Sequence, residues 1–251
     1  MKGSGIYRNG CSKGDDVKSE VTCWQPAPQE STIREGELHL WRFNLDCHEH
    51  EFDILLALLT QDEIRRADRL LDLKKKKQFI VARARLRQIL ANYLKINPCH
   101  IKLQYNHHGK PSLAESHHSL LSFNLSHSRN WGILAIVNKF AVGIDIERIE
   151  QGLNFAQFAD QFFAENEKIQ LAQYPVERQR RGFYRIWTQK EAMLKAEGAG
   201  FQKILLSDEH SKTKKWHLTA FPIAPDYVCS IATKKEFISI QRFHFTDLTE
   251  L

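Results

Sequence analysis

The chain has 251 residues, of which 42% are hydrophobic and 26% are charged, and this composition is typical of a soluble globular protein. No apolar run approaches the roughly 20 residues that span a bilayer, which argues against a membrane-spanning helix and a membrane partner. The formal net charge of +6 and the pI of about 9.0 favour anionic partners, namely nucleic acid, acidic proteins or phosphorylated small molecules.

The N-terminal residues 1–30 are polar, rich in Gly, Ser and Pro, and without periodicity, which predicts a disordered extension. They also lack the apolar segment of a signal peptide. The five cysteines of the chain are scattered and odd in number, as expected for reduced thiols. Together these features predict a cytoplasmic protein.

Regular elements are predicted from residue 36 onward. Residues 36–45 alternate between apolar and polar side chains and predict a strand, and residues 51–59 predict a helix. A second helix is expected over residues 60–71. It begins with a capping box, because Thr60 is followed three residues later by Glu63.

A long amphipathic helix is predicted over residues 74–96, with the lysines of 74–77 as its solvated start. At about 100° per residue, Arg83 falls in the middle of the apolar stripe, Arg87 within its edge, and Arg85 on the polar side. The stripe itself consists of Phe79, Leu86, Leu90, Tyr93 and Leu94. An arginine on an apolar face is costly unless its charge is met. It either forms an internal ion pair or snorkels at the core edge, or it binds a ligand phosphate.

The remaining elements mix strands and helices without the alternation of a βαβ protein, which predicts an α+β fold. Gly198 is expected to end the last long helix. The predicted elements are strands over 119–128, 131–138 and 142–150, helices over 154–174 and 177–198, and short strands from about residue 204.

Polar side chains mark two turns of the first half. Lys110 lies in the Gly-Pro turn "HHGKPS", and Ser126 and His127 end the apolar strand that contains "FNLSHS". A lysine in a turn is commonly a surface charge, and a serine and histidine there commonly satisfy the turn itself. Alternatively, the hydroxyl, the imidazole and nearby backbone N–H groups hold a phosphate.

Carboxylates gather in two segments of the second half. In "VGIDIE" the aliphatic residues alternate with Asp145 and Glu147, which therefore share one face of a strand. In "WTQKEAMLK", Glu191 and Lys195 are four residues apart and share a helix face, where they form either a surface ion pair or part of a site. Three carboxylates with room for water and phosphate oxygens suit Mg²⁺.

Four motifs together carry a resemblance to a known family. In this order and spacing, "GKP", "FNLSHS", "VGIDIE" and "WTQKEAMLKAEGAGF" resemble the 4′-phosphopantetheinyl transferase superfamily. The chain looks like the larger, monomeric, surfactin-synthetase-activating (Sfp-type) branch, and it is similar in style to cyanobacterial members. The resemblance covers roughly residues 35–240. The "CHEH" at 47–50 has no second Cys/His pair at zinc spacing and is not interpreted as a metal site.

The resemblance implies a fold of two similar α+β halves related by a pseudo-twofold, with coenzyme A in the cleft between them. Residues 31–138 would form the N-terminal half and residues 139–251 the C-terminal half with the metal site. By motif match, Asp145, Glu147 and Glu191 would hold Mg²⁺. Nothing in the resemblance assigns a role to residues 1–30.

The resemblance also implies the residues that bind coenzyme A. Lys110, Ser126 and His127 would bind the nucleotide phosphates. A basic residue of the first long helix contacts coenzyme A in this family, and this sequence offers Arg83 or Arg87 for that role.

The implied reaction is Mg²⁺-dependent transfer of 4′-phosphopantetheine from coenzyme A to a serine of an apo carrier protein, with 3′,5′-ADP as the leaving group. Lys195 would contact the phosphates and assist the transfer, and Glu191, Glu147 or a metal-bound water would be the base. The carrier would be an acidic helical bundle, which matches the positive charge. A nucleic-acid-binding protein would leave the carboxylates unexplained. An inactive coenzyme A binder would keep Lys110 and His127, but nothing in this sequence indicates loss of activity, since every acidic position is filled.

Overall fold

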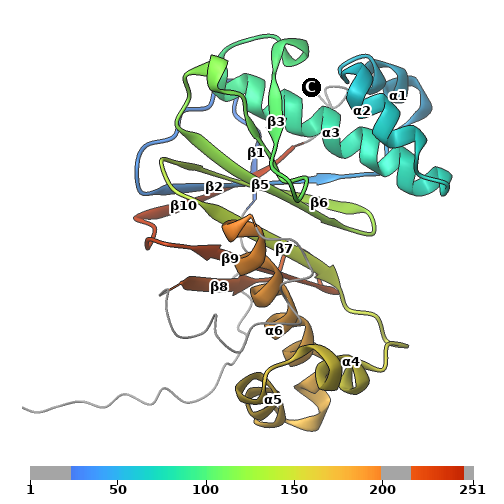
Figure 1. Cartoon of the computed structure of the whole chain (residues 1–251), viewed down its shortest axis with the longest axis vertical. Helices are drawn as coiled ribbons and strands as arrows, with labels where there is room; N and C mark the ends of the chain where they lie inside the picture. Colours follow the sequence, from blue (N-terminus) through green and yellow to red (C-terminus); the bar gives the residue numbers. More distant parts are fainter. Residues whose placement is uncertain (1–23, 199–215, 246–251) are drawn as a thin grey trace, which may run out of the picture.

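A computed structural model describes residues 24–198 and 216–245 of the chain (Figure 1). Each half contains the same succession of elements: a strand, two helices of eight residues, one helix of 22 residues, and further strands. This repeated order confirms the predicted α+β class and the two similar halves.

The first half contains most elements where the sequence predicts them. The capping box of the second helix is confirmed, because Glu63 Oε2 accepts the backbone N–H of Thr60 at 3.0 Å and Thr60 Oγ1 accepts the backbone N–H of Glu63 at 3.4 Å. The elements are β1 (Gln25–Pro26), β2 (Glu37–Asn44), α1 (Glu49–Leu56), α2 (Gln61–Asp68), α3 (Leu73–Leu94), β3 (Leu103–Tyr105), β4 (Pro111–Leu113), β5 (Leu121–Ser128) and β6 (Trp131–Asn138), with 3₁₀ turns at Pro98–His100 and Glu115–His117.

The second half differs from expectation in one helix. The single helix predicted over 154–174 is two helices, because Phe163 is extended and the Glu167 side chain accepts the backbone N–H of Ala164 at 2.8 Å. The elements are β7 (Val142–Arg148), α4 (Phe155–Phe162), α5 (Glu165–Ala172), α6 (Val176–Glu197), β8 (His217–Phe221), β9 (Tyr227–Thr233) and β10 (Ser239–His244). The residues predicted as strands between 204 and 215 lie outside the described residues.

The sheets connect the two halves. The five-stranded sheet has the order β1-β10-β2-β6-β5, and β10 pairs in parallel with β2 although it comes from the second half. A separate three-stranded sheet has the order β7-β9-β8. The two sheets meet where β5 lies beside β7. There the Asn124 side chain accepts the backbone N–H of Ile144 at 2.8 Å, and Ser128 Oγ accepts that of Arg148 at 3.1 Å.

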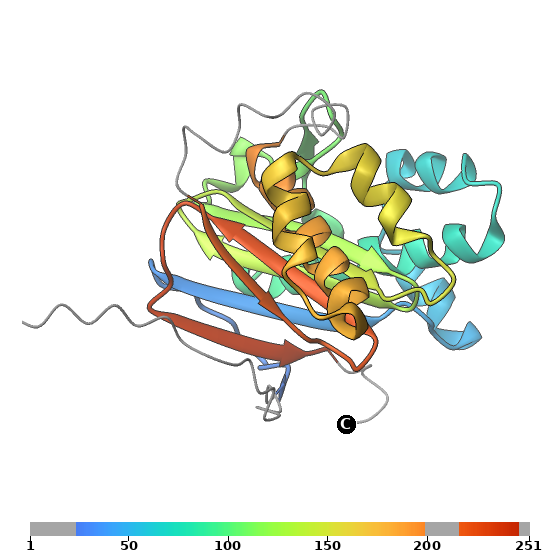
Figure 2. The ribbon, with the colours of Figure 1, turned by 90° about the horizontal axis from the view of Figure 1, so that it is seen from below.

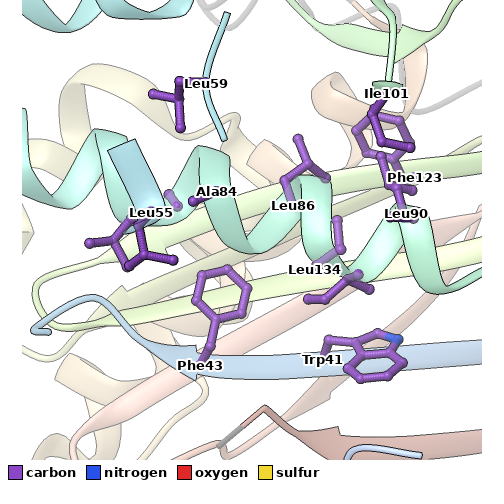
Figure 3. Close-up of a cluster of buried hydrophobic side chains, with 14 of the residues drawn as sticks. Trp41, Phe43, Leu55, Leu59, Ala84, Leu86, Leu90, Ile101, Phe123 and Leu134 are labelled. Carbon is purple, nitrogen blue, oxygen red and sulfur yellow. The ribbon is translucent and has the colours of Figure 1, made fainter. Parts of the chain in front are cut away.

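Strand β2 is buried on both faces, and each face belongs to a different core. Trp41 and Phe43 face α3, which lies across the five-stranded sheet, as Figure 3 shows. Leu38 and Leu40 face the opposite way and pack with Ile144 of β7 and its neighbours. The sheet of the first half is therefore the central layer of the protein.

Helix α3 is enclosed rather than amphipathic, because the sheet covers one side of it and α1 and α2 cover another (Figure 1). Arg85, which the helical periodicity places on the polar side, is only 4% exposed. Its guanidinium lies over the ring of Phe245 at 4.9 Å and donates to Gln88 Oε1 at 3.0 Å. The prediction for Arg85 was therefore wrong, since no side of this stretch of helix faces solvent freely.

Helix α6 lies directly on the three-stranded sheet, as Figure 2 shows. Gly143 of β7 permits this approach, since a Cβ there would lie 1.9 Å from the carbonyl oxygen of Ala192. A buried hydrogen bond of 2.7 Å between Thr188 Oγ1 and Ser230 Oγ fixes α6 to β9. This packing sets the position of the polar residues at the end of α6.

The expected extension is partly structured. Residues 24–30 belong to the described part of the chain and pack on the first half. The Asn92 side chain donates to the carbonyl oxygens of Pro28 and Gln29, and Arg42 lies over the ring of Trp24 at 4.6 Å. Residues 1–23 lie outside the described residues, so the expectation for them stays a prediction. Within the described ranges, no helix has both the length and the apolar character needed to cross a bilayer.

Candidate active site

The face of β7 that carries the carboxylates lies between β5 and α6. This arrangement places three predicted site residues in contact, namely Ser126 of β5, Asp145 of β7 and Lys195 of α6. Ser126 Oγ donates to Asp145 Oδ1 at 3.0 Å. Lys195 Nζ donates to the same carboxylate oxygen at 2.5 Å and to Ser126 Oγ at 2.9 Å. Asp145 is only 4% exposed, so Lys195 and Ser126 together stabilise a buried negative charge.

Glu147 lies one step further along the same strand and has its own hydroxyl partner. Ser128 Oγ donates to Glu147 Oε2 at 2.9 Å. The sequence reasoning missed Ser128, although its spacing of two from Ser126 places both hydroxyls on one face of β5. Two serines of β5 thus hold the two carboxylates of β7.

The site contains more negative charge than its own cations neutralise. The pKa of both Glu147 and Glu191 is raised to about 7, mainly by burial and to a lesser extent by the negative charge of Asp145. Asp145 Oδ2 and Glu191 Oε1 are buried and have no hydrogen-bond partner. Unpartnered carboxylate oxygens are the donors that a hard divalent cation requires. The three carboxylates fit such an ion by their chemistry, although they do not converge into a ready-made metal cluster in the described part of the chain.

Lys110 connects the β3–β4 turn to α6. Its Nζ donates to the carbonyl oxygens of Lys195 and Val142, and burial lowers its pKa to about 8. The neighbouring Asn106 side chain donates to the carbonyl oxygen of Gly198, the C-cap of α6, at 3.0 Å. The turn that contains "GKP" therefore holds the end of the helix on which Lys195 lies, and the nucleotide role of Lys110 stays a prediction.

The two candidate arginines of α3 have different environments. Arg87 is 1% exposed, pairs with Glu63 at 2.8 Å, and donates to the carbonyl oxygen of Ile101 at 2.9 Å. The internal ion pair is therefore the correct interpretation for Arg87. Arg83 instead lies 5.7 Å over the ring of Tyr105, and its buried Nη1 has no hydrogen-bond partner. Of the two, Arg83 has the guanidinium that is available to a ligand.

Further polar and charged groups extend the site from Arg83 toward Lys195. Burial, together with the positive charges of Lys195 and Arg83, lowers the pKa of His127, so the three groups lie within electrostatic range of one another. Arg66, which the sequence reasoning missed, also lies over the ring of Tyr105, at 3.8 Å from the ring centre. The carboxylates are thus bordered by the cations Lys195, Arg83 and Arg66 and by the imidazole of His127, whose lowered pKa favours its neutral form. Cations of this kind are expected for binding a polyphosphate.

Comparison with known proteins identifies the family. A sequence model described as the 4′-phosphopantetheinyl transferase superfamily matches residues 141–239. A second, described as the N-terminal part of 4′-phosphopantetheinyl transferase, matches residues 44–139. The chain is 38% identical over 182 residues to 4′-phosphopantetheinyl transferase HetI of Nostoc sp. PCC 7120, across 72% of this chain and 77% of the relative. The chain belongs to the 4′-phosphopantetheinyl transferase superfamily.

Two further relatives place this transferase within the family. It is 31% identical over 183 residues to a protein of Synechocystis sp. PCC 6803, across 68% of this chain and 74% of the relative. It is 34% identical over 151 residues to 4′-phosphopantetheinyl transferase gsp of Aneurinibacillus migulanus, across 60% of this chain and 61% of the relative. The predicted similarity to Sfp-type and cyanobacterial transferases is confirmed, and the protein is an enzyme of this type.

Proposed function

We propose that this transferase moves the 4′-phosphopantetheine arm of coenzyme A to a serine hydroxyl of an apo acyl or peptidyl carrier protein. The new bond joins the serine oxygen to the β-phosphorus, the pyrophosphate bond breaks, and 3′,5′-ADP leaves. The observation that supports this most is the group of incompletely neutralised carboxylates beside Lys195, His127 and Arg83. A nucleic-acid-binding surface gives no reason to bury carboxylates.

The carboxylates of Asp145, Glu147 and Glu191 are proposed to hold Mg²⁺, and the two unpartnered buried oxygens support this assignment. When bound, the ion would supply positive charge to the pyrophosphate. The carboxylates that hold it are positioned before any ligand binds, since Ser126 and Ser128 orient two of them from β5.

The serine proton needs a base, and Glu147 and Glu191 are the candidates. Without a bound cation, burial and the charge of Asp145 raise the pKa of each glutamate to about 7. The glutamate that a bound ion leaves free would keep a raised pKa and accept a proton at neutral pH more readily than an ordinary glutamate does. Lys195 uses two of its three N–H groups on Asp145 and Ser126. The third is proposed to contact a phosphate oxygen, where its charge stabilises the transition state.

The nucleotide phosphates are proposed to lie against His127, Arg83 and Lys110, with Arg66 as an additional contact. Ser126 is 5% exposed and already bonded within the site, so its proposed contribution is to hold Asp145 and Lys195. We propose that the enzyme acts as a cytoplasmic monomer, without a nucleic-acid or membrane partner. The scattered free cysteines at Cys47, Cys99 and Cys229 support a reducing compartment.

The deciding experiment is incubation with coenzyme A, Mg²⁺ and an apo carrier protein, followed by intact-mass measurement of the carrier. The carrier should gain the mass of one phosphopantetheine arm, and omission of Mg²⁺ with added chelator should abolish the gain. Binding of coenzyme A without any mass gain would show an inactive coenzyme A binder. Binding of nucleic acid, with neither coenzyme A binding nor a mass gain of the carrier, would refute the proposal.

A further inference from the structure

Two leucines at the corner between α2 and α3 are unusually exposed. Leu71 is 98% exposed and Leu73 is 75% exposed, and they flank Asp72, the N-cap of α3. Leu71 is the most exposed large hydrophobic residue in the described ranges. Neighbouring exposed apolar side chains with a polar rim mark interaction surfaces more often than isolated ones do.

The rim of this corner is positively charged. Arg69, Lys74 and Lys75 adjoin the leucines in the sequence, and none of the ion pairs found among residues 24–198 and 216–245 includes them. The acidic groups nearby are already engaged. Asp72 accepts the backbone N–H groups of Lys74 and Lys75 at 2.8 and 3.1 Å. Asp62 pairs with Arg65 of α2, and Asp68 pairs with Lys76 of α3. The corner therefore presents unneutralised positive charge around an apolar centre.

A pocket of about 480 Å³ connects this corner to the active site. Its walls come from two parts of the chain: the start of α3 supplies Lys74 and Lys75, and the end of β5 supplies His127 and Ser128. Ser128 is the residue that hydrogen-bonds Glu147. A protein seated on the corner would therefore lie next to the proposed site of transfer, and Figure 1 shows the start of α3 and the β5–β6 turn on the same side of the molecule.

We propose that this corner, defined by Arg69, Leu71, Leu73, Lys74 and Lys75, is the docking surface for the acidic apo carrier protein. The inference rests on the proposed function, which requires a protein that presents a serine to the site. The chemistry of the corner fits an acidic helix next to that serine, with apolar side chains that cover the leucines and carboxylates that meet the cations. Charge complementarity of this kind mainly accelerates association and aligns the partner.

The test uses two double variants of the full-length enzyme, Leu71→Ser with Leu73→Ser and Lys74→Glu with Lys75→Glu. With coenzyme A saturating, each should raise the KM for an acidic apo carrier by about tenfold or more. The kcat, the coenzyme A affinity measured by calorimetry and the thermal unfolding temperature should stay unchanged. The charge variant should also lose most of the salt dependence of KM.

Matched controls separate the corner from general effects. Val176→Ser replaces a residue that is 82% exposed at the start of α6. Lys234→Glu with Lys235→Glu makes the same charge change on another exposed lysine pair. Both controls should leave the KM for carrier unchanged.

Three results would overturn the docking surface. An unchanged KM in both corner variants would exclude it, and an equal rise in the Lys234/Lys235 control would assign the effect to net charge alone. A weaker coenzyme A affinity in the corner variants would assign the corner to the nucleotide. A wild-type enzyme that modifies no apo carrier at all would refute the proposed function as well, so the two failures are distinguishable.

Discussion

Substitution of Gly143 with alanine would place a methyl group against the backbone of α6. The added Cβ would lie 1.9 Å from the carbonyl oxygen of Ala192 and 2.4 Å from the backbone nitrogen of Ala196, whereas ordinary contact begins at 3.4 Å. The helix would have to retreat by about 1.5 Å, the difference between 3.4 and 1.9 Å. No rotamer change can relieve this contact, because the atoms that collide belong to the backbone.

The displaced segment is the one that holds the site. Glu191 precedes Ala192 and Lys195 precedes Ala196, so a shift of α6 moves both functional side chains away from Asp145. A misplacement of about 1 Å can reduce the rate by about 10²-fold, and overpacking typically costs about 1–3 kcal/mol of stability. We therefore expect kcat/KM to fall about 10²-fold and the unfolding temperature to fall by several degrees.

The assay compares Gly143→Ala with Gly152→Ala, in carrier modification and in thermal unfolding. A Cβ at Gly152 would have no neighbour within 4 Å, so that variant should behave like the wild type. Wild-type activity together with wild-type stability in Gly143→Ala would refute the inference that the contact between β7 and α6 positions the site.

Four further outcomes are expected. Asp145→Asn should reduce Mg²⁺-dependent transfer by about 10²–10³-fold without loss of the folded state by circular dichroism, and full activity without added metal would contradict the metal site. Burial lowers the pKa of His39 to about 4 in the folded protein. Between this value and the pKa of about 6.5 in the unfolded chain, the imidazole is neutral in the folded state and protonated in the unfolded state. Stability should therefore fall as the pH drops from about 6.5 toward 4, by about 2 kcal/mol at pH 5, and denaturant titrations should show this slope reduced in His39→Gln. Arg87→Met should lower the free energy of unfolding by about 3–5 kcal/mol because it leaves a buried carboxylate unpaired, whereas Arg83→Leu should weaken coenzyme A binding in calorimetry and leave stability near that of the wild type.

Local sequence patterns predicted the elements that local interactions determine. The capping box at Thr60 and the alternation around Asp145 depend on residues a few positions apart, and both are present in the structure. Periodicity failed for Arg85 because it assumes that one side of a helix faces solvent. The break between α4 and α5 was also missed, although part of it is local, since Glu167 accepts the backbone N–H of Ala164. Lys190, distant in sequence, also donates to the carbonyl oxygen of Phe162 at 2.9 Å.

In the candidate site, too, the sequence predicted local features but not the contacts between distant residues. The four motifs identified the residues, but the contacts join positions far apart: Lys195 reaches Ser126 across 69 positions and Asp145 across 50. The sequence left Arg83 and Arg87 as alternatives, since only the packing of α2 against α3 decides which guanidinium meets Glu63. Ser128 could have been found from its spacing of two from Ser126.

The insertion of β10 beside β2 has a consequence for synthesis of the protein. Glu37 is opposite Ser239 in this parallel pair, so nearly the whole chain must leave the ribosome before β2 gains its second neighbour. Until then, one edge of β2 offers unpaired backbone groups to other nascent chains, which is a known route to aggregation. Pairing across such a separation also slows folding. The two halves, despite their similar succession of elements, are therefore not separable modules, and expression of residues 31–138 alone should yield an incomplete sheet that is recovered only as aggregate or with the rest of the chain supplied in trans.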